Sequence, residues 1–179
     1  METVKQKADK AYDLMKGEFG YKNKLSAPKL VKVILASGTG TAMKKDRTVN
    51  DRIVDRLSKI TGQRPTVRGA KQSIASFKIR TNDPVGVAVT IRGERMNSFL
   101  DKFINVAVPR MKDFRGFDAK AIDDIGNLTL GIKEHTIFPE CADEELKDVF
   151  GFGLTIVTTA KNKKEAKAFF DHIGIPFKK

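Results

Sequence analysis

A run of basic side chains without a single acid is the most chemically distinctive feature of this sequence. The residues from Arg56 to Asn82 include seven Lys or Arg and no Asp or Glu, whereas acids and bases are mixed elsewhere. A field of one sign attracts a polyanion. A solvated surface loop is the alternative interpretation. The seven cations are Arg56, Lys59, Arg64, Arg68, Lys71, Lys78 and Arg80.

Small polar and glycine residues separate these cations. Such residues let a backbone approach phosphates closely and hydrogen-bond to sugars and bases. The pattern therefore favours a segment that contacts nucleic acid through hydrogen bonds as well as through charge. The residues in question are Thr61, Gly62, Gln63, Thr66, Gly69, Gln72, Ser73 and Ser76.

The composition of the whole chain points to the same class of partner. The 179 residues include 34 Lys or Arg and 22 Asp or Glu, for a net charge of +12 and an isoelectric point near 9.8. Values above about 9 are typical of nucleic-acid binders, although composition does not separate RNA from DNA. No lipidation signal, long apolar run or N-terminal targeting pattern is present, so we expect a cytoplasmic protein without membrane contact.

Metal and disulfide chemistry have little support in the sequence. The one cysteine, Cys141, excludes an intramolecular disulfide and a multi-cysteine zinc site. His135 and His172 have no second His or Cys at ligand spacing, so structural roles are expected for both. We therefore expect no metal, no cofactor, no small-molecule substrate and no catalytic residue.

Hydrophobic periodicity predicts helices and strands without an internal repeat. Helices are expected over residues 1–20, ended by Gly17 and Gly20, then over 49–60, 96–107 and 162–173. Strands are expected over residues 30–36, 65–68, 74–80, 85–91, 128–132 and 154–158. Strands clustered in this way predict a single α+β domain over residues 1–179, with a mainly antiparallel sheet and helices packed on one face.

The second face of that sheet is expected to be open. In the strand from Val85 to Ile91, large apolar residues alternate with Gly86, Ala88 and Thr90. Such a face of small residues, rimmed by Arg, would suit irregular RNA, which proteins recognise through its shape, 2′-hydroxyls and exposed bases.

Two shorter motifs have more than one interpretation. The turn from Ser37 to Thr41 resembles a phosphate cradle, but it completes neither the dinucleotide nor the Walker pattern. It would serve as an RNA backbone contact, as a plain turn, or, in a rival hypothesis, as the nucleotide site of an RNA-modifying or RNA-remodelling enzyme using residues 38–44. Arg92 and Arg95 flank a strand–helix junction at Gly93 and are either structural or phosphate ligands.

Ordered motifs occupy residues 60–65, 70–80, 89–96, 108–116, 126–134, 137–140 and 156–161. Together these blocks resemble the bacterial family of large-subunit ribosomal protein five. The resemblance runs from about residue 30 to the C-terminus, and long motifs in a fixed order are far more specific than a glycine pattern.

The resemblance implies an α+β structural protein that anchors 5S ribosomal RNA in the central protuberance of the large subunit. It also implies contacts with 23S ribosomal RNA, with the peptidyl-site tRNA, with neighbouring large-subunit proteins, and with a small-subunit head protein across an intersubunit bridge. Family 5S-binding positions map onto Gln63 and Thr90, and a third, an Asn in the family, maps onto Ala36. The glycines that follow, Gly38 and Gly40, are kept.

Three sets of contact residues follow from charge and resemblance together. The loop over about residues 70–82 is expected to be mobile without RNA and to contact tRNA; a hairpin that covers the core is the alternative. The 5S set is Lys32, Ala36, Gly38, Gly40, Gln63, Arg64, Thr66, Arg68, Thr90, Arg92 and Arg95. The tRNA set is Lys71, Gln72, Ser73, Lys78 and Arg80, and the set for other ribosomal RNA or bridge contacts is Arg110, Lys112 and Arg115.

Overall fold

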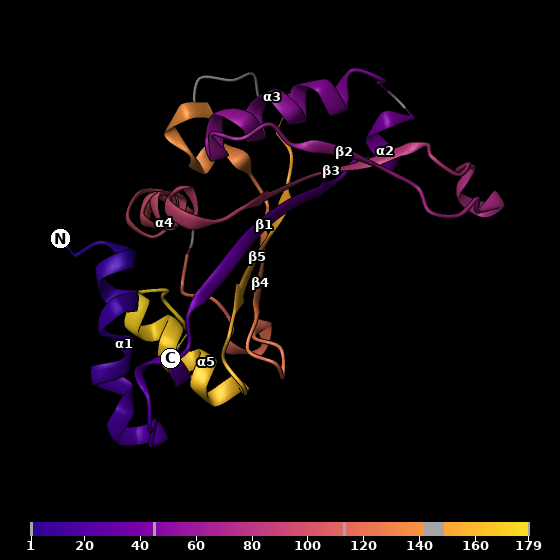
Figure 1. Ribbon diagram of the computed structural model, residues 1–179. Helices are drawn as coiled ribbons and strands as arrows, with labels where there is room; N and C mark the ends of the chain where they lie inside the picture. Colours follow the sequence, from indigo (N-terminus) through magenta and orange to yellow (C-terminus); the bar gives the residue numbers. More distant parts are fainter. Residues whose placement is uncertain (1, 45, 113, 142–148, 179) are drawn as a thin grey trace. The chain divides into compact units, whose positions relative to one another are not determined.

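The computed structural model describes residues 2–44, 46–112, 114–141 and 149–178 (Figure 1). The chain forms two compact units, each assembled from segments that are distant in sequence. Unit one comprises Met1–Val33, Arg92–Leu130 and Leu154–Lys179, and unit two comprises Ile34–Ile91 and Gly131–Gly153.

The strands of the described residues form one five-stranded sheet in the order β2-β3-β1-β5-β4. Strand β2 pairs antiparallel with β3, with Thr66 opposite Ala88 and Arg68 opposite Gly86. The predicted α+β class with a mainly antiparallel sheet is confirmed, while the single domain over 1–179 stays a prediction. The strands are β1 Leu30–Gly38, β2 Thr66–Gly69, β3 Pro84–Ile91, β4 Leu128–Ile132 and β5 Phe152–Thr158.

Unit one is built around the helices α1 (Val4–Phe19), α4 (Gly93–Lys102) and α5 (Lys163–Ile173). Hydrogen bonds between side chain and backbone join the helices to one another. The Val4 backbone amide donates to the Asp101 carboxylate at 2.7 Å, and the Lys7 ammonium donates to the Ile173 carbonyl at 2.9 Å. The helix core contains several fully buried large side chains, which are Leu100, Phe103, Phe169 and Phe170.

Unit two packs helix α3 (Val49–Thr61) against β3, and the short helix α2 (Gly40–Met43) lies against the same strand. The helix presents an apolar stripe because its buried residues recur every three or four positions. Its stripe is Ile53, Leu57 and Ile60, and the buried residues of β3 are Val87, Val89 and Ile91.

Helix ends follow the expected capping chemistry, except that the structure corrects one prediction for α1 and one for α5. Helix α1 continues through Gly17 and ends at Gly20, which adopts a left-handed φ of 63°, so the prediction that Gly17 breaks the helix is wrong. Asn162 caps α5 by accepting from the Glu165 amide, but the Glu165 carboxylate accepts from Lys161, not from Asn162, so the capping box is only half formed.

Two other predicted elements differ in the structure. The predicted strand over residues 74–80 is absent: only Ile74 and Ile79 form a bridge, and Ala75–Phe77 make a 3-10 turn. The predicted helix over residues 96–107 begins earlier, at Gly93. The helix then continues as a π-helical turn over Phe103–Ala107 and as a 3-10 turn over Val108–Arg110, which contains Pro109.

Glycine 62 illustrates how the fold positions its neighbours. It ends α3 with a left-handed φ of 67°, and a Cβ there would meet nothing within 4 Å. Gly62→Ala should therefore lower the free energy of unfolding by about 1 kcal/mol through backbone strain alone.

The matched control is Gly17→Ala, because Gly17 lies inside α1 with ordinary helical angles and an equally open surrounding. It should raise the free energy of unfolding by roughly 0.5–1 kcal/mol. Urea denaturation of both variants measures the contrast. Changes of the same sign would contradict this account of the two glycines.

Candidate nucleic-acid interface

Strands β1, β2 and β3 of unit two carry small residues on the face opposite their buried side chains. In β1, Val33, Leu35 and Ser37 are buried while Ala36 is exposed. In an antiparallel pair, directly opposed residues share a face. The register of β2 and β3, with the alternation along each strand, therefore defines one surface, here called the outward face: Ala36, Thr66, Arg68, Gly86, Ala88 and Thr90.

The outward face has the composition expected from the β3 alternation, while its use as an RNA platform stays a prediction. Its residues are half-buried or exposed, none of them is acidic, and Arg68 supplies a cation at the β2 edge. At Gly86 a Cβ would lie 3.1 Å from the Ser37 carbonyl oxygen, so glycine lets β3 lie close to β1. The side chains of this face are mostly small, so they project little from the backbone of β3.

Gln63 is held beside this face by its own side chain. It follows Gly62 at the end of α3, and its amide nitrogen donates to the Thr90 carbonyl oxygen at 3.1 Å. Its amide oxygen forms no hydrogen bond to the described residues, so it remains available as an acceptor. The two residues that the family resemblance paired are thus directly linked. Arg64, next in the chain, is exposed.

The polar side chains of Ser37 and Thr39 in the turn after β1 point into the protein, while a phosphate contact by the backbone of this turn stays a prediction. The Ser37 hydroxyl donates to the Gly151 carbonyl at 2.8 Å, and the Thr39 amide donates to the Val85 carbonyl at 2.9 Å. The Thr39 side chain is only 1% exposed. The polar groups of the turn therefore face the protein. Of the predicted contacts here, Gly38 is exposed and Gly40 begins α2.

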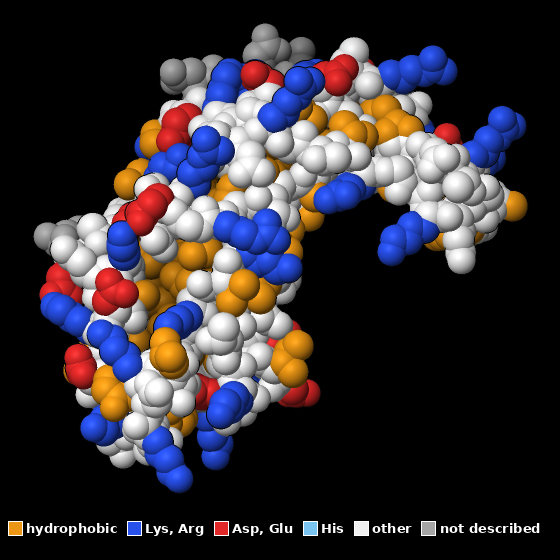
Figure 2. All heavy atoms as spheres, viewed as in Figure 1, with side chains coloured by type: hydrophobic (Ala, Val, Ile, Leu, Met, Phe, Trp, Pro, Cys, Tyr) orange, Lys and Arg blue, Asp and Glu red, His pale blue; other side chains and the backbone are white. Residues whose placement is uncertain are grey.

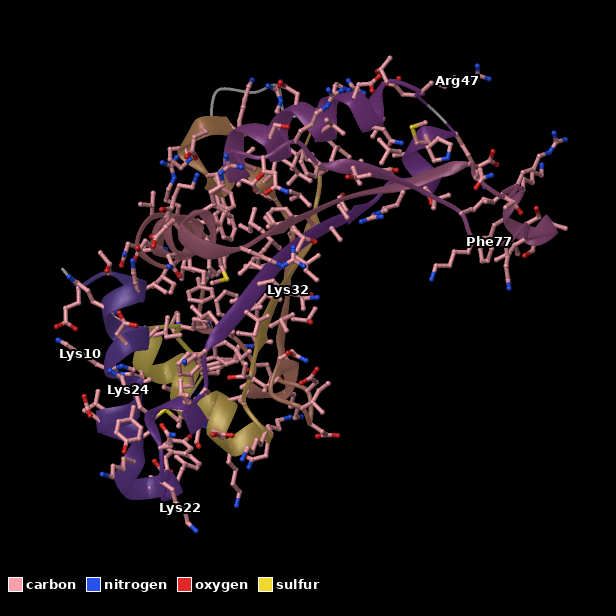
Figure 3. All side chains as sticks on the ribbon, in the orientation of Figure 1. Lys10, Lys22, Lys24, Lys32, Arg47 and Phe77 are labelled. Atoms are coloured by element: carbon pink, nitrogen blue, oxygen red, sulfur yellow. The ribbon has the colours of Figure 1, made fainter. Side chains whose placement is uncertain are left out.

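Six of the predicted RNA-contacting cations belong to unit one. Lys32 is half-buried on β1 (Figure 3), on the strand face opposite Val33. Arg92 occupies the N-cap position of α4 without a side-chain capping bond, and both it and Arg95 are exposed. The exposed set after α4 is Arg110, Lys112 and Arg115.

Residues 70–82, here called the excursion, project from the β2–β3 pair of unit two. The Ala70 amide donates to the Asp83 carbonyl, and the Asn82 amide donates to the Ala70 carbonyl at 2.9 Å, which closes its base. Further along, Ser73 and Thr81 hydrogen-bond through their hydroxyls at 3.0 Å. The predicted mobility of the excursion stays a prediction.

Two of the three large apolar side chains of the excursion, Ile74 and Phe77, are exposed, and Ile79 is half-buried; sequence reasoning missed this exposure. Phe77 is 60% exposed and Ile74 is 44% exposed, so the excursion does not cover the core and the alternative of a covering hairpin is wrong. Phe77 lies in its outer part (Figure 3), and the Lys44 ammonium donates to the Phe77 carbonyl. Figure 2 shows Lys or Arg side chains beside the hydrophobic ones in this part of the molecule. The cations of the excursion, Lys71, Lys78 and Arg80, are all exposed.

Other kinds of site find no support in the described part of the chain. No group of three or more His, Cys, Asp or Glu among those residues could hold a metal ion. None of the helices described is long and apolar enough to cross a membrane. His135 is fully buried and stacks on Phe150 with ring centroids 4.2 Å apart, and Cys141 is buried, as structural roles require.

Comparison with protein-family models decides the family. The model described as ribosomal protein L5 matches residues 23–80, and a second model, which describes the C-terminus of the same ribosomal family, matches residues 84–177. This chain belongs to the ribosomal protein L5 family.

Relatives in this family cover nearly the whole chain. The large ribosomal subunit protein uL5 of Natranaerobius thermophilus is 48% identical over 91% of this chain and 90% of its own length. Those of Trichlorobacter lovleyi and Flavobacterium johnsoniae are each 46% identical, over 92% of this chain and 91% and 90% of their own lengths. The resemblance first seen in short blocks is confirmed.

The Gln63–Thr90 hydrogen bond can be tested without RNA. Gln63→Ala should lower the free energy of unfolding by about 1 kcal/mol, because the Thr90 carbonyl loses a part-buried donor. Gln72→Ala is the matched control, since Gln72 is an exposed glutamine of the excursion. Urea denaturation compares the two variants, and equal effects would show that the bond contributes nothing.

Proposed function

We propose that this chain binds 5S ribosomal RNA through the outward face of unit two and links it to 23S ribosomal RNA in the central protuberance. Membership in the L5 family makes it a structural, non-enzymatic protein of the large ribosomal subunit, located in the ribosome in the cytoplasm. The same membership removes the rival hypothesis of a nucleotide-dependent enzyme at residues 38–44. The inward-facing polar groups of that turn agree with this.

The outward face is the observation that supports 5S binding most directly. An uncovered sheet surface of Ala, Gly and Thr without an acid has no packing role for its small side chains, whereas an RNA groove can lie flat against it. Thr90 offers a hydroxyl, and Gln63 offers its amide oxygen. Arg64 and Arg68 stand beside them as exposed phosphate ligands.

The excursion suits a second RNA partner, which we propose to be the peptidyl-site tRNA. Its three cations would bind a phosphate backbone regardless of sequence. Its exposed Phe77 adds a ring that can stack on a base or ribose. We assign the cluster after α4 (Arg110, Lys112 and Arg115) to other ribosomal RNA or to the bridge with a small-subunit head protein.

Removing the Thr90 hydroxyl should weaken 5S binding while the fold stays intact. Thr90→Val keeps the side-chain shape and the β-branched character. The loss of binding free energy therefore reports one polar contact, and we expect about 1–3 kcal/mol. Filter binding measures it. Arg68→Ala should also reduce the dependence of binding on salt by about one counterion.

The matched control for Arg68 is Arg47→Ala. Arg47 is likewise exposed in unit two, but it lies near the start of α3 and not on the outward face (Figure 3). It should leave 5S affinity and its salt dependence almost unchanged. The specific claim fails if wild-type protein binds 5S RNA and an unrelated folded RNA equally at physiological salt.

Position 36 allows a gain-of-affinity test. Ala36 is exposed on β1, so Ala36→Asn should preserve the strand and restore an amide that can both donate and accept. We expect modestly tighter 5S binding. Ala36→Asp, which has nearly the same shape, should weaken binding because it places a negative charge on the outward face. Unchanged or weaker binding by Ala36→Asn would show that another group already fills this role.

Charge reversal separates the two RNA partners. The combined variant Lys71→Glu, Lys78→Glu and Arg80→Glu should lose tRNA retention in the peptidyl site and keep 5S binding nearly intact. The chain contains no Trp, so Phe77→Trp supplies a single fluorescent reporter in the excursion. Its emission should change with tRNA and not with 5S RNA. If the triple variant loses both RNAs, the excursion belongs to the 5S site.

A further inference from the structure

Unit one contains a groove that the proposed RNA contacts do not use. It lies between α1, the segment from Lys24 to Val31, and the first turns of α4, and it has a volume of about 660 Å³. That volume falls within the range of binding pockets, roughly 300–1,000 Å³. We call it the N-terminal groove. Figure 2 shows hydrophobic side chains gathered between the positions of α1 and α4, with charged side chains around them.

The lining of the N-terminal groove exposes large apolar side chains that the fold does not bury. Leu25 is 74% exposed and Val31 is 41% exposed, and both line the groove. Tyr12 of α1 and the buried Met96 of α4 continue the same surface. Val31 alternates in phase with the buried Val33 of the same strand but is itself exposed. A contiguous apolar surface within a concave site marks an interaction site more often than scattered exposed residues do.

The charges around the groove are unevenly distributed. On the α1–α4 wall, the Lys5 ammonium pairs with Glu94 at 2.7 Å, and this bond raises the pKa of Lys5. Asp9 adds a second acid to that wall. On the opposite wall, Lys24 and Lys29 form no ion pair with any described residue. The groove therefore offers two uncompensated cations on one side only.

We propose that the N-terminal groove docks a segment of a neighbouring ribosomal protein that carries apolar side chains and a carboxylate. The apolar side chains would cover Leu25 and Val31. The carboxylate would lie against Lys24 and Lys29. This arrangement gives the apolar centre and polar rim of a protein interface.

RNA is a poorer fit for this groove. A phosphate backbone carries a charge at every step, and along the groove it would meet Asp9 on the wall where the Lys5 charge is already paired with Glu94. The exposed Leu25 and Val31 provide no hydrogen bond to a sugar or a phosphate. A protein segment with one carboxylate can place that charge against Lys24 and Lys29 and keep only apolar side chains elsewhere in the groove.

Site-specific photo-crosslinking in assembled large subunits tests the proposal. The photoreactive residue p-benzoylphenylalanine replaces Leu25 in one variant and Leu14 in another. Leu14 is the matched control, because it is a 64% exposed leucine of α1 that does not line the groove. Mass spectrometry should find position 25 joined to a peptide of another ribosomal protein with a nearby Asp or Glu, at a yield several-fold above position 14.

Two further variants separate charge from apolar contact. Lys24→Glu with Lys29→Glu should reduce the crosslink from position 25 several-fold, whereas Lys10→Glu with Lys22→Glu, two exposed lysines outside the groove (Figure 3), should not. Crosslinks from position 25 to ribosomal RNA alone would overturn the proposal in favour of a nucleic-acid occupant. A yield no higher than at position 14 would show that the groove stays open in the ribosome.

Discussion

One-sided burial of the sheet is the constraint on which this structure depends. Side chains alternate between the faces of a strand, so a sheet that packs helices on one face leaves every second residue outside the core. Val87 and Val89 are buried on the inner face of β3. Gly86, Ala88 and Thr90 lie on the other face, and their side chains are too small to form a second hydrophobic core. Hydrophobic burial thus holds the fold together and at the same time leaves a surface free for another molecule.

Strand and helix patterns in the sequence predicted most of the fold, for an identifiable reason. The β3 and β4 alternations are regular, and α5 begins at a capping Asn and ends at a left-handed glycine, so local chemistry and tertiary packing agree there. Gly17 is the counterexample. A glycine inside a helix costs about 1 kcal/mol relative to alanine, and the docking of α1 through Val4 and Met15 outweighs that cost.

The candidate site was predictable in composition but not in its connections. Period-two alternation placed Thr90 on the outward face, and the family resemblance paired it with Gln63. No sequence pattern shows that the Gln63 amide donates to the Thr90 carbonyl. The exposure of Phe77 and Val31 could not be predicted either: apolar type predicts burial only where another element covers the residue, and no described element covers these two.

The closed base of the excursion has a consequence for how this protein can change over evolutionary time. Backbone hydrogen bonds at Ala70 and Asn82 complete the β2–β3 ladder before the chain departs from it, and a Cβ at Gly69 would press on the Asn82 backbone at 3.2 Å. We therefore expect the strand register to tolerate sequence changes in the outer residues of the excursion, whereas the close approach at Gly69 restricts that position to glycine. Constraint on the outer residues would then come from the RNA partner proposed for them and not from the fold.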